Sequence, residues 1–248
     1  MRIYLSPEVI AKKIGIILPS DKARHVVSVI RCKIDDEITV FDGRGRSYLA
    51  KIAGIQKKSV LIDIIQEVMI DTESSANLVL CQGILRGEKM DLVIQKSTEL
   101  GIKQVIPLIS GRCQVKETRK TPRWRKIAEE AAEQCGRSVV PGISEPQIFG
   151  NFFETSNSVE SPQGIIFWER GGLSPDEALE KIGPTEAPLF LCIGPEGGFM
   201  QSEVEMAESR NFVRATLGSR ILRAETASMV AVALVQFLAE KNKTSGKV

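Results

Sequence analysis

The sequence predicts an α/β protein in which a parallel sheet is covered by helices on both faces, with a smaller β-rich domain in front of it. Two patterns support this fold class. After residue 77, short apolar runs alternate with segments of helical periodicity, which is typical of parallel strands joined by crossover helices. Before that point, β-rich runs alternate with turn sequences, which is typical of a meander in a small barrel or sheet.

The N-terminal domain is predicted from three β-rich runs. Turn sequences separate them, first Asp42-Gly43-Arg44-Gly45 and then Gln56-Lys57-Lys58-Ser59. The polar segment of small residues at 71–77 has the composition of a linker. We therefore expect one domain at residues 1–72 and a second at 73–248. The predicted strands span residues 38–41, 48–55 and 60–68.

The second domain is predicted to begin with an apolar strand at 78–85. Apolar residues at helical spacing, followed by Gly101, indicate a helix at 89–100. The segment 141–163 is rich in Pro, Gly, Ser and Asn, and we expect it to be irregular. Further strands are predicted at 105–109, 164–168, 189–193 and 212–217, and helices at 124–135, 175–182 and 202–209, with a last long helix ending near residue 241.

Charge is unevenly distributed along the 248 residues. Lys and Arg number 33 against 31 Asp and Glu, so the net charge of +2 excludes a strongly basic, histone-like protein. The net charge is +4 over residues 1–70, −2 over 71–85, +5 over 86–137 and −5 over 138–248. This asymmetry suggests an anionic partner that touches mainly the first half.

Several classes of site are excluded by residue usage. His25 is the one histidine, so a two-His zinc site is impossible, and we expect it to be structural or on the surface. The longest apolar stretch, 229–235, is far too short to cross a bilayer, which favours a cytoplasmic protein. The five cysteines lack a CxxC spacing and are expected to be small buried hydrophobes: Cys32, Cys81, Cys113, Cys135 and Cys192.

Two segments join a strand to a glycine-containing turn. In the sequence LFLCIGPEGGF at 189–199, the glycines allow positive φ and close approach of a ligand, although a simple tight turn is the alternative. It matches neither the dinucleotide nor the P-loop motif. In LGSRILRAET at 217–226, Arg220 and Arg223 are one helical turn apart and are expected to share a face. We expect the two strand ends to form neighbouring walls of one cleft.

Two further segments suggest macromolecular contacts. Residues 112–126 contain seven basic residues and one acid, and such clusters bind phosphates when they are not simply solvated. Trp124 within this segment is a candidate for stacking on a base. The helix at 226–239 is apolar almost all round, so it is either a core helix or a dimer contact.

Together these segments resemble the RsmE family of ribosomal RNA uridine-N3 methyltransferases, members of the SPOUT superfamily. The combination of IGPEGG at 193–198 with LGSRILRAET is highly specific to it. The resemblance extends over nearly the whole chain. Its other segments are Arg2-Ile3-Tyr4, Arg24 and Arg31 on either side of a helix, Phe41-Asp42-Gly43, Lys57-Lys58-Ser59-Val60, RGEKMD at 86–91, IQKSTELG at 94–101 and EQCGR at 133–137.

The resemblance implies a SPOUT-type knotted parallel-sheet domain with a C-terminal trefoil knot, and a PUA-like N-terminal β-barrel that helps to hold RNA. It implies a homodimer that uses S-adenosyl-L-methionine (SAM), without metal or membrane, to methylate N3 of one uridine in the decoding region of 16S rRNA within the assembled small ribosomal subunit. Residues expected to bind SAM are Ile193, Gly194, Gly197, Gly198, Leu217, Gly218, Ile221, Leu222 and Arg223. Residues expected to bind RNA are Arg2, Arg24, Arg31, Arg86, Lys89, Arg112, Lys116 and Arg123.

The implied chemistry needs help with a proton, because uracil N3 holds a proton whose pKa is well above 7. Without a usable histidine, we expect Arg223 or Arg137 to stabilise the uridine anion and Glu225 or Glu99 to accept or orient the proton. Capping or ion pairing within the fold is the alternative for both glutamates. A catalytically inactive RNA-binding ribosome-maturation factor is the alternative function, and damaged glycine loops would mark it. A nucleotide-binding enzyme would need phosphate motifs that the sequence lacks.

Overall fold

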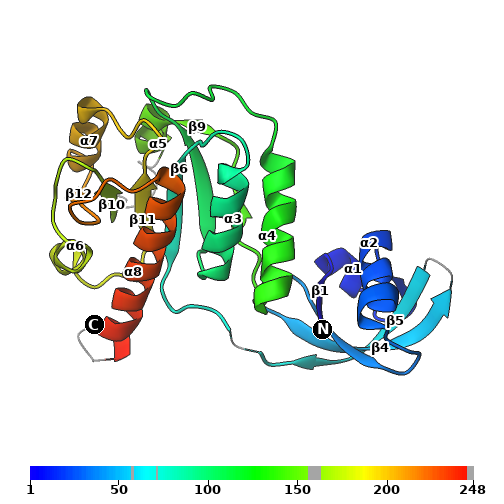
Figure 1. Ribbon diagram of the computed structural model, residues 1–248. Coiled ribbons are helices and arrows are strands. Elements are labelled where there is room, and N and C mark those ends of the chain that lie inside the picture. Colours follow the sequence, from blue (N-terminus) through cyan, green and yellow to red (C-terminus); the bar gives the residue numbers. More distant parts are fainter. Residues whose placement is uncertain (57–58, 71, 156–162, 245–248) are drawn as a thin grey trace. The chain divides into compact units, whose positions relative to one another are not determined.

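The chain divides into two compact units in the computed structural model (Figure 1). The N-terminal unit comprises Met1–Glu73 and Glu129–Val140, and the C-terminal unit comprises Ser74–Ala128 and Pro141–Val248. The structure describes residues 1–56, 59–70, 72–155 and 163–244. Lys57 and Lys58 of the second predicted turn, Asp71 of the predicted linker and residues 156–162 of the segment expected to be irregular lie outside the described residues.

The N-terminal unit contains a five-stranded sheet in the order β1-β3-β4-β5-β2. The three predicted strands are confirmed, and two short ones were missed. In the long β4-β5 pair the register shifts between Leu49 and Ala50 and again between Ile52 and Gly54, and such bulges bend a sheet. The strands are β1 (Arg2–Tyr4), β2 (Ile16–Ile17), β3 (Glu37–Phe41), β4 (Ser47–Gln56) and β5 (Ser59–Val68).

Short helices accompany this sheet: α1 (Pro7–Ile10), α2 (Ser20–Arg24) and the π-helix η1 (His25–Ile30). His25 is exposed at the start of η1, as expected for a surface histidine. Arg24 and Arg31 lie on either side of η1, which is the arrangement that the family resemblance implied. Arg31 ends the helix in the left-handed conformation, with φ of 61°.

The C-terminal unit is built on a sheet in the order β12-β10-β11-β6-β7-β8, with β9 also pairing with β7. Each of these pairs is parallel, which confirms the predicted fold class. The strands are β6 (Leu78–Gly83), β7 (Gln104–Ile109), β8 (Gly142–Ile143), β9 (Gln147–Ile148), β10 (Gln163–Phe167), β11 (Leu189–Ile193) and β12 (Phe212–Ala215).

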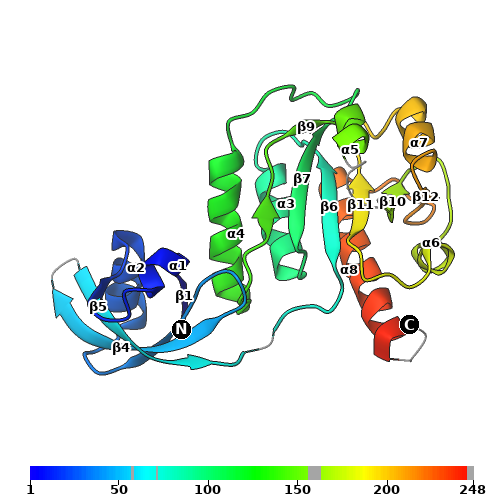
Figure 2. The same ribbon diagram turned by 180° about the vertical axis from the view of Figure 1, so that it is seen from behind.

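Helices cover both faces of this sheet. Successive strand residues face opposite sides, and Cys81 packs in a cluster with phenylalanines of α5 and with Val204 of α7, whereas Gln82 contacts Ser228 of α8. Figure 1 shows α3 and α8 in front of the strands, and they lie beyond the strands when seen from behind (Figure 2). The helices are α3 (Lys89–Glu99), α4 (Thr121–Cys135), α5 (Phe149–Thr155), α6 (Pro175–Ile182), α7 (Gln201–Glu208) and α8 (Ala224–Thr244).

The structure corrects the prediction that 141–163 is irregular. This segment contains β8, β9 and the helix α5, because three phenylalanines pack into the core there, Phe149, Phe152 and Phe153, each at most 3% exposed. Burial of an apolar face stabilises so short a helix despite the loop-like composition around it. The boundaries of α6 and β11 agree with the prediction, and a capping box of Ser174 and Glu177 begins α6.

Three of the five cysteines are buried, as expected, while Cys32 and Cys135 are partly exposed. Burial raises the pKa of the Cys81 thiol well above its ordinary value, and Cys192 on the neighbouring strand β11 raises it further. Cys81 is therefore a neutral thiol within strand β6.

Candidate functional site

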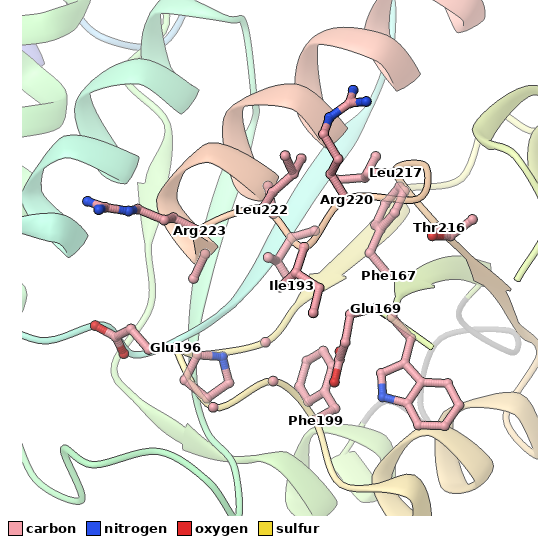
Figure 3. A pocket seen from close by; sticks show the side chains of 18 of the residues that line it. Phe167, Glu169, Ile193, Glu196, Phe199, Thr216, Leu217, Arg220, Leu222 and Arg223 are labelled. Atoms are coloured by element: carbon pink, nitrogen blue, oxygen red, sulfur yellow. The ribbon is translucent and has the colours of Figure 1, made fainter. Parts of the chain in front are cut away.

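A cavity of about 460 Å³ lies at the carboxyl ends of β10, β11 and β12, in the C-terminal unit (Figure 3). Three segments line it: residues 167–169 after β10, the glycine-rich loop (194–198) after β11, and the arginine loop (216–223) after β12. The two loops that we expected to form one cleft thus meet around one pocket. Its volume lies within the range of small-molecule sites, about 300–1,000 Å³.

All nine residues that the family resemblance assigned to the cofactor line this pocket. Figure 3 shows Leu217 and Leu222 of the arginine loop across from Glu196 and Phe199, with Ile193 between the two sides. The nine are Ile193, Gly194, Gly197, Gly198, Leu217, Gly218, Ile221, Leu222 and Arg223. Their role in binding stays a prediction.

The glycine-rich loop turns back on itself at Gly198. The Gly198 N–H donates to the Pro195 carbonyl at 2.8 Å, and Gly198 has φ of +68°, which favours glycine. A Cβ on Gly198 would lie 3.1 Å from each carboxylate oxygen of Glu169. Glu169 therefore rests against the loop backbone, and glycine makes room for it.

One lysine faces two carboxylates at the pocket. The Lys89 Nζ lies 3.6 Å from Glu196 Oε1 and 3.6 Å from Glu225 Oε2. Glu225 is 9% exposed, and its Oε2 has no hydrogen-bond partner among the described residues. The Arg86 backbone N–H donates to Glu196 Oε1 at 3.0 Å. Lys89, which we expected to bind RNA, thus links α3 to the glycine-rich loop and to the first turn of α8.

The expectation that Arg220 and Arg223 share a helix face is wrong. Residues 217–223 are not helical, because α8 begins only at Ala224, and the two guanidiniums point in different directions (Figure 3). Within the described part of the chain, neither guanidinium makes a hydrogen bond or an ion pair, and the Glu169 carboxylate makes none either. The pocket therefore holds charged groups that are free to bind a ligand.

Sequence reasoning missed the third segment of the pocket, Phe167, Trp168 and Glu169. Trp168 is 8% exposed, and the guanidiniums of Arg170 and Arg214 lie 5.7 and 5.6 Å from its ring centroid. The available signal was that these residues follow a third parallel strand, whose carboxyl end meets the same sheet edge as the other two.

The other two residues expected in catalysis are not among those that line the pocket. Arg137 belongs to the N-terminal unit, is 3% exposed, and donates from Nη2 to Glu73 Oε2 at 2.7 Å. Glu99 ends α3 and accepts from Lys96 Nζ at 2.8 Å. Both make the kind of ion pair within the fold that we gave as the alternative for the glutamates.

The eight residues expected to bind RNA fall into two groups. Arg24, Arg31 and Arg86 are exposed, and their guanidiniums make no ion pair or hydrogen bond with any residue that the structure describes. Arg2, by contrast, donates to the Gly136 carbonyl and to Ser138 Oγ inside the N-terminal unit.

The other four residues expected to bind RNA make hydrogen bonds or ion pairs within the protein. Arg112 Nη1 donates to the Gly197 carbonyl at 3.1 Å, and Lys116 donates to two carbonyls of its own loop. Arg123 pairs with Asp91 at 2.8 Å, while its side chain stays 60% exposed. Lys89 is engaged at the pocket.

The expectation that Trp124 stacks on a base is wrong. Trp124 is 1% exposed, and its Nε1–H donates to Asp91 Oδ1 at 3.0 Å. Asp91 lies on α3, so this bond joins α3 to α4. The basic residues around Trp124 face solvent while the indole is part of the core.

Among the described residues, no group of three or more His, Cys, Asp or Glu side chains is arranged to hold a metal ion. None of the helices in this same part of the chain has the length and apolar character needed to cross a membrane.

Comparison with known families gives two matches. An RNA methyltransferase domain matches residues 72–236, and an RNA methyltransferase PUA domain matches residues 18–65. Ribosomal RNA small subunit methyltransferase E from Buchnera aphidicola subsp. Acyrthosiphon pisum is 35% identical, covering 88% of this chain and 86% of that protein. The protein of the same name from Bacillus subtilis is 29% identical, covering 90% of each.

Solved structures agree with these matches. The crystal structure of a ribosomal RNA small subunit methyltransferase E from Neisseria gonorrhoeae bound to SAM has a TM-score of 0.83 at 33% identity, covering 96% of this chain and 97% of that chain. A Legionella pneumophila methyltransferase in complex with SAM has a TM-score of 0.82 at 32% identity, covering 95% and 96%.

Proposed function

This chain belongs to the family of ribosomal RNA small subunit methyltransferase E, and from that membership we propose that it transfers the methyl group of SAM to N3 of one uridine in the decoding region of 16S rRNA. The observation that supports this most directly is that nine residues expected to bind SAM line one pocket. We further propose that the substrate is the assembled small subunit, in the cytoplasm. The inactive maturation factor is not favoured, because both glycine loops are intact.

The residues of the pocket fit SAM. Ile193, Leu217 and Leu222 offer apolar surface for an adenine ring, and the glycine-rich loop lets a ligand approach the backbone closely. The unpaired carboxylate of Glu169 complements either the ribose hydroxyls or the ammonium group of SAM. Bound SAM supplies a methyl group on a positively charged sulfur.

In the proposed reaction, uridine N3 forms a bond to the methyl carbon, the carbon–sulfur bond breaks with its electron pair going to sulfur, and the N3 proton passes to a base. We assign the base to Glu225, which is 9% exposed and whose Oε2 accepts no hydrogen bond from the described residues. We assign stabilisation of the uridine anion to Arg223, whose guanidinium makes no ion pair or hydrogen bond with the residues that the structure describes. Arg137 and Glu99 gain no support from their contacts.

RNA binding is proposed for the exposed, unpaired arginines Arg24, Arg31 and Arg86. Arg112, Lys116 and Arg123 keep exposed side chains and stay candidates. Replacing Arg31 with Ala should weaken RNA binding and reduce its salt dependence, with SAM affinity unchanged. A variant whose salt dependence equals that of the native protein would exclude Arg31.

We also propose the homodimer and the trefoil knot that the family resemblance implies. Leu234 and Phe237 of α8 are 41% and 63% exposed, so α8 presents apolar surface to a partner. A monomer by light scattering at micromolar concentration would exclude the dimer. The knot is supported by the path of the chain, since α8 leaves the edge strand β12 and packs on β11 and β6 in the middle of the sheet. An experimental chain trace would test it.

The experiment that tests the function is methyl transfer from labelled SAM to small subunits isolated from cells that lack this gene. Nucleoside mass spectrometry of the digested RNA identifies the product, and protein-free 16S rRNA is assayed in parallel. We expect label in 3-methyluridine from subunits and not from free RNA. Intact SAM binding without label would exclude this RNA target, and absence of SAM binding would favour the maturation factor.

A further inference from the structure

Gln82 is a polar residue in an otherwise apolar strand, and it pairs with a strand residue that lines the pocket. It is 0% exposed in β6, where each of the six residues is buried. Its register partner is Ile193, the last residue of β11 and a lining residue of the pocket. A buried amide is stable only when its donors and acceptor are paired, so its partners indicate its role.

The Gln82 side chain joins three segments of the chain. Nε2 donates to the Gly83 carbonyl at 2.9 Å and lies 3.4 Å from the Gly194 carbonyl of the glycine-rich loop. These two acceptors fix the orientation of the amide, because a carbonyl oxygen in place of Nε2 would have nothing to accept. Oε1 therefore faces Ser228 of α8 and accepts a hydrogen bond from its hydroxyl group.

The glycine-rich loop packs onto the end of β6 without intervening side chains. A Cβ on Gly83 would lie 2.5 Å from the Pro195 nitrogen and 2.9 Å from the Gly194 carbonyl carbon, closer than real Cβ contacts. On the other side, Ser228 is 0% exposed and follows Ala227, which lines the pocket. Gln82 thus contacts the loop on one side of the pocket and the helix on the other, although it does not line the pocket itself.

We propose that Gln82 is a positioning residue for the cofactor pocket, holding the glycine-rich loop and the first turns of α8 at the spacing that SAM requires. This inference rests on the proposed function, in which the pocket binds SAM. A hydrogen bond in the low-dielectric interior of a protein is stronger than one in water, and it fixes the relative positions of the groups that it joins. Binding groups must be held within about 0.5 Å of their productive geometry, which supporting contacts of this kind provide.

The test is the affinity of the purified protein for SAM, measured by calorimetry. Gln82→Met keeps the length of the side chain, leaves the Gly194 carbonyl without this donor, and lets the Ser228 hydroxyl turn to the Ala224 carbonyl, 2.8 Å away. We expect SAM to bind about tenfold more weakly. In protein without SAM, we also expect faster amide hydrogen exchange in residues 194–199.

The matched control is Ser97→Ala, which removes a hydroxyl on α3 that is 0% exposed, has no hydrogen-bond partner in the described residues and lies outside the pocket lining. It should leave SAM affinity and loop exchange unchanged. Folded Gln82→Met protein that binds SAM within twofold of the native affinity would overturn the proposal, even if its melting temperature were lower.

Ser228→Ala decides the question if Gln82→Met does not fold. It removes the link to α8 but keeps the link to Gly194, so we expect SAM to bind roughly threefold more weakly, with recovery in Ser228→Thr. Native affinity in Ser228→Ala would then overturn the proposal. Native protein that binds no SAM would instead contradict the proposed function itself, and the positioning role with it.

Discussion

Two clusters of charged residues in this molecule differ in how fully their charges are paired. In the N-terminal unit, Arg137 and Glu73 form an ion pair at 2.7 Å with side chains 4% and 16% exposed, and Glu73 also accepts from the backbone N–H groups of Ser138 and Val139. At the pocket, Arg223 and Glu169 have no such partner among the described residues. The charges of the first cluster stabilise the fold, while those of Arg223 and Glu169 are available to bind a ligand.

The difference teaches how to separate structural from functional arginines. The sequence alone does not distinguish Arg137 from Arg223, because each belongs to a segment that resembles the family. Arg137 ends EQCGR at 133–137, and Arg223 lies within LGSRILRAET at 217–226. Burial requires a charge to be paired, because desolvation costs more than an unpaired charge can recover. An exposed charge has no such requirement, so an unpaired arginine that lines a pocket is a better candidate for binding an anion than one that is already neutralised.

Breaking the paired cluster should have the largest effect. Glu73→Gln removes the carboxylate charge that pairs with the buried Arg137 cation, so we expect the free energy of unfolding to fall by about 3–5 kcal/mol in urea denaturation. The control is Asp35→Asn in the exposed Lys51–Asp35 pair, with side chains 47% and 74% exposed, where a much smaller loss of stability is expected. Equal losses in the two variants would show that burial does not distinguish them.

Removing the unpaired arginine should affect catalysis and leave stability nearly unchanged. Arg223→Ala should lower turnover by more than about tenfold, because the developing uridine anion loses its positive partner. The free energy of unfolding should change by no more than about 0.5 kcal/mol, as for other surface substitutions. Arg220→Ala is the matched control, since Arg220 likewise has no partner in the described part of the chain but points in another direction (Figure 3). Unchanged turnover in Arg223→Ala would remove it from the mechanism.

A smaller loss of SAM affinity should show whether a side chain in the pocket, rather than backbone strain alone, weakens binding. Gly198→Ala places a side chain at φ +68° and 3.1 Å from the Glu169 carboxylate oxygens, so it should weaken SAM binding roughly fivefold and cost about 1–2 kcal/mol of stability. Gly183→Ala is also strained, because Gly183 has φ +79° and ψ −179°, although nothing lies within 4 Å of its Cβ. It should lose at least as much stability and keep native SAM affinity. Weaker SAM binding in both variants would mean that strain, rather than Glu169, sets the affinity.

The smallest effect on stability is expected at the start of α6, where the charged carboxylates are exposed but hydrogen-bonded. Hydrogen bonds with Ser174 at the start of α6 lower the pKa of Glu177 and of Asp176 from their ordinary values of 4.5 and 3.8. A lowered carboxyl pKa in the folded state stabilises the fold above the ordinary pKa, and this contribution is lost as the pH falls through the folded value. The protection of amides at the start of α6, measured relative to their intrinsic exchange rates, should therefore decrease on acidification below about pH 4. Ser174→Ala should remove most of this pH dependence; if it does not, these bonds are not its source.

Local signals in the sequence were sufficient for the regular elements. Ser174, Pro175 and Gly183 delimit α6 on their own, and the apolar run before the glycine-rich loop identifies β11. The pocket followed from two strand ends that meet at one sheet edge. The family resemblance then selected the individual residues that line it.

The predictions that failed concerned structure that depends on partners far away in the sequence. The partner of Trp124 is Asp91 on another helix, and α5 is stabilised by burial among aromatic residues far along the chain, such as Phe212. Arg220 and Arg223 have helical spacing, yet the helix starts one residue after Arg223. Gln82 did offer a signal, a polar residue inside an apolar strand, but its meaning depends on Gly194 and Ser228, which are more than a hundred residues away.

The position of Trp168 gives the protein an optical reporter of its own. The chain has two tryptophans, and Trp124 is enclosed in the core with its N–H bonded to Asp91, whereas Trp168 lines the pocket beneath two guanidiniums. A ligand that enters the pocket changes the surroundings of one indole and leaves the other as an internal reference. Intrinsic fluorescence can therefore follow ligand binding in stopped-flow measurements without any label, and the signal should vanish in Trp168→Phe and persist in Trp124→Phe.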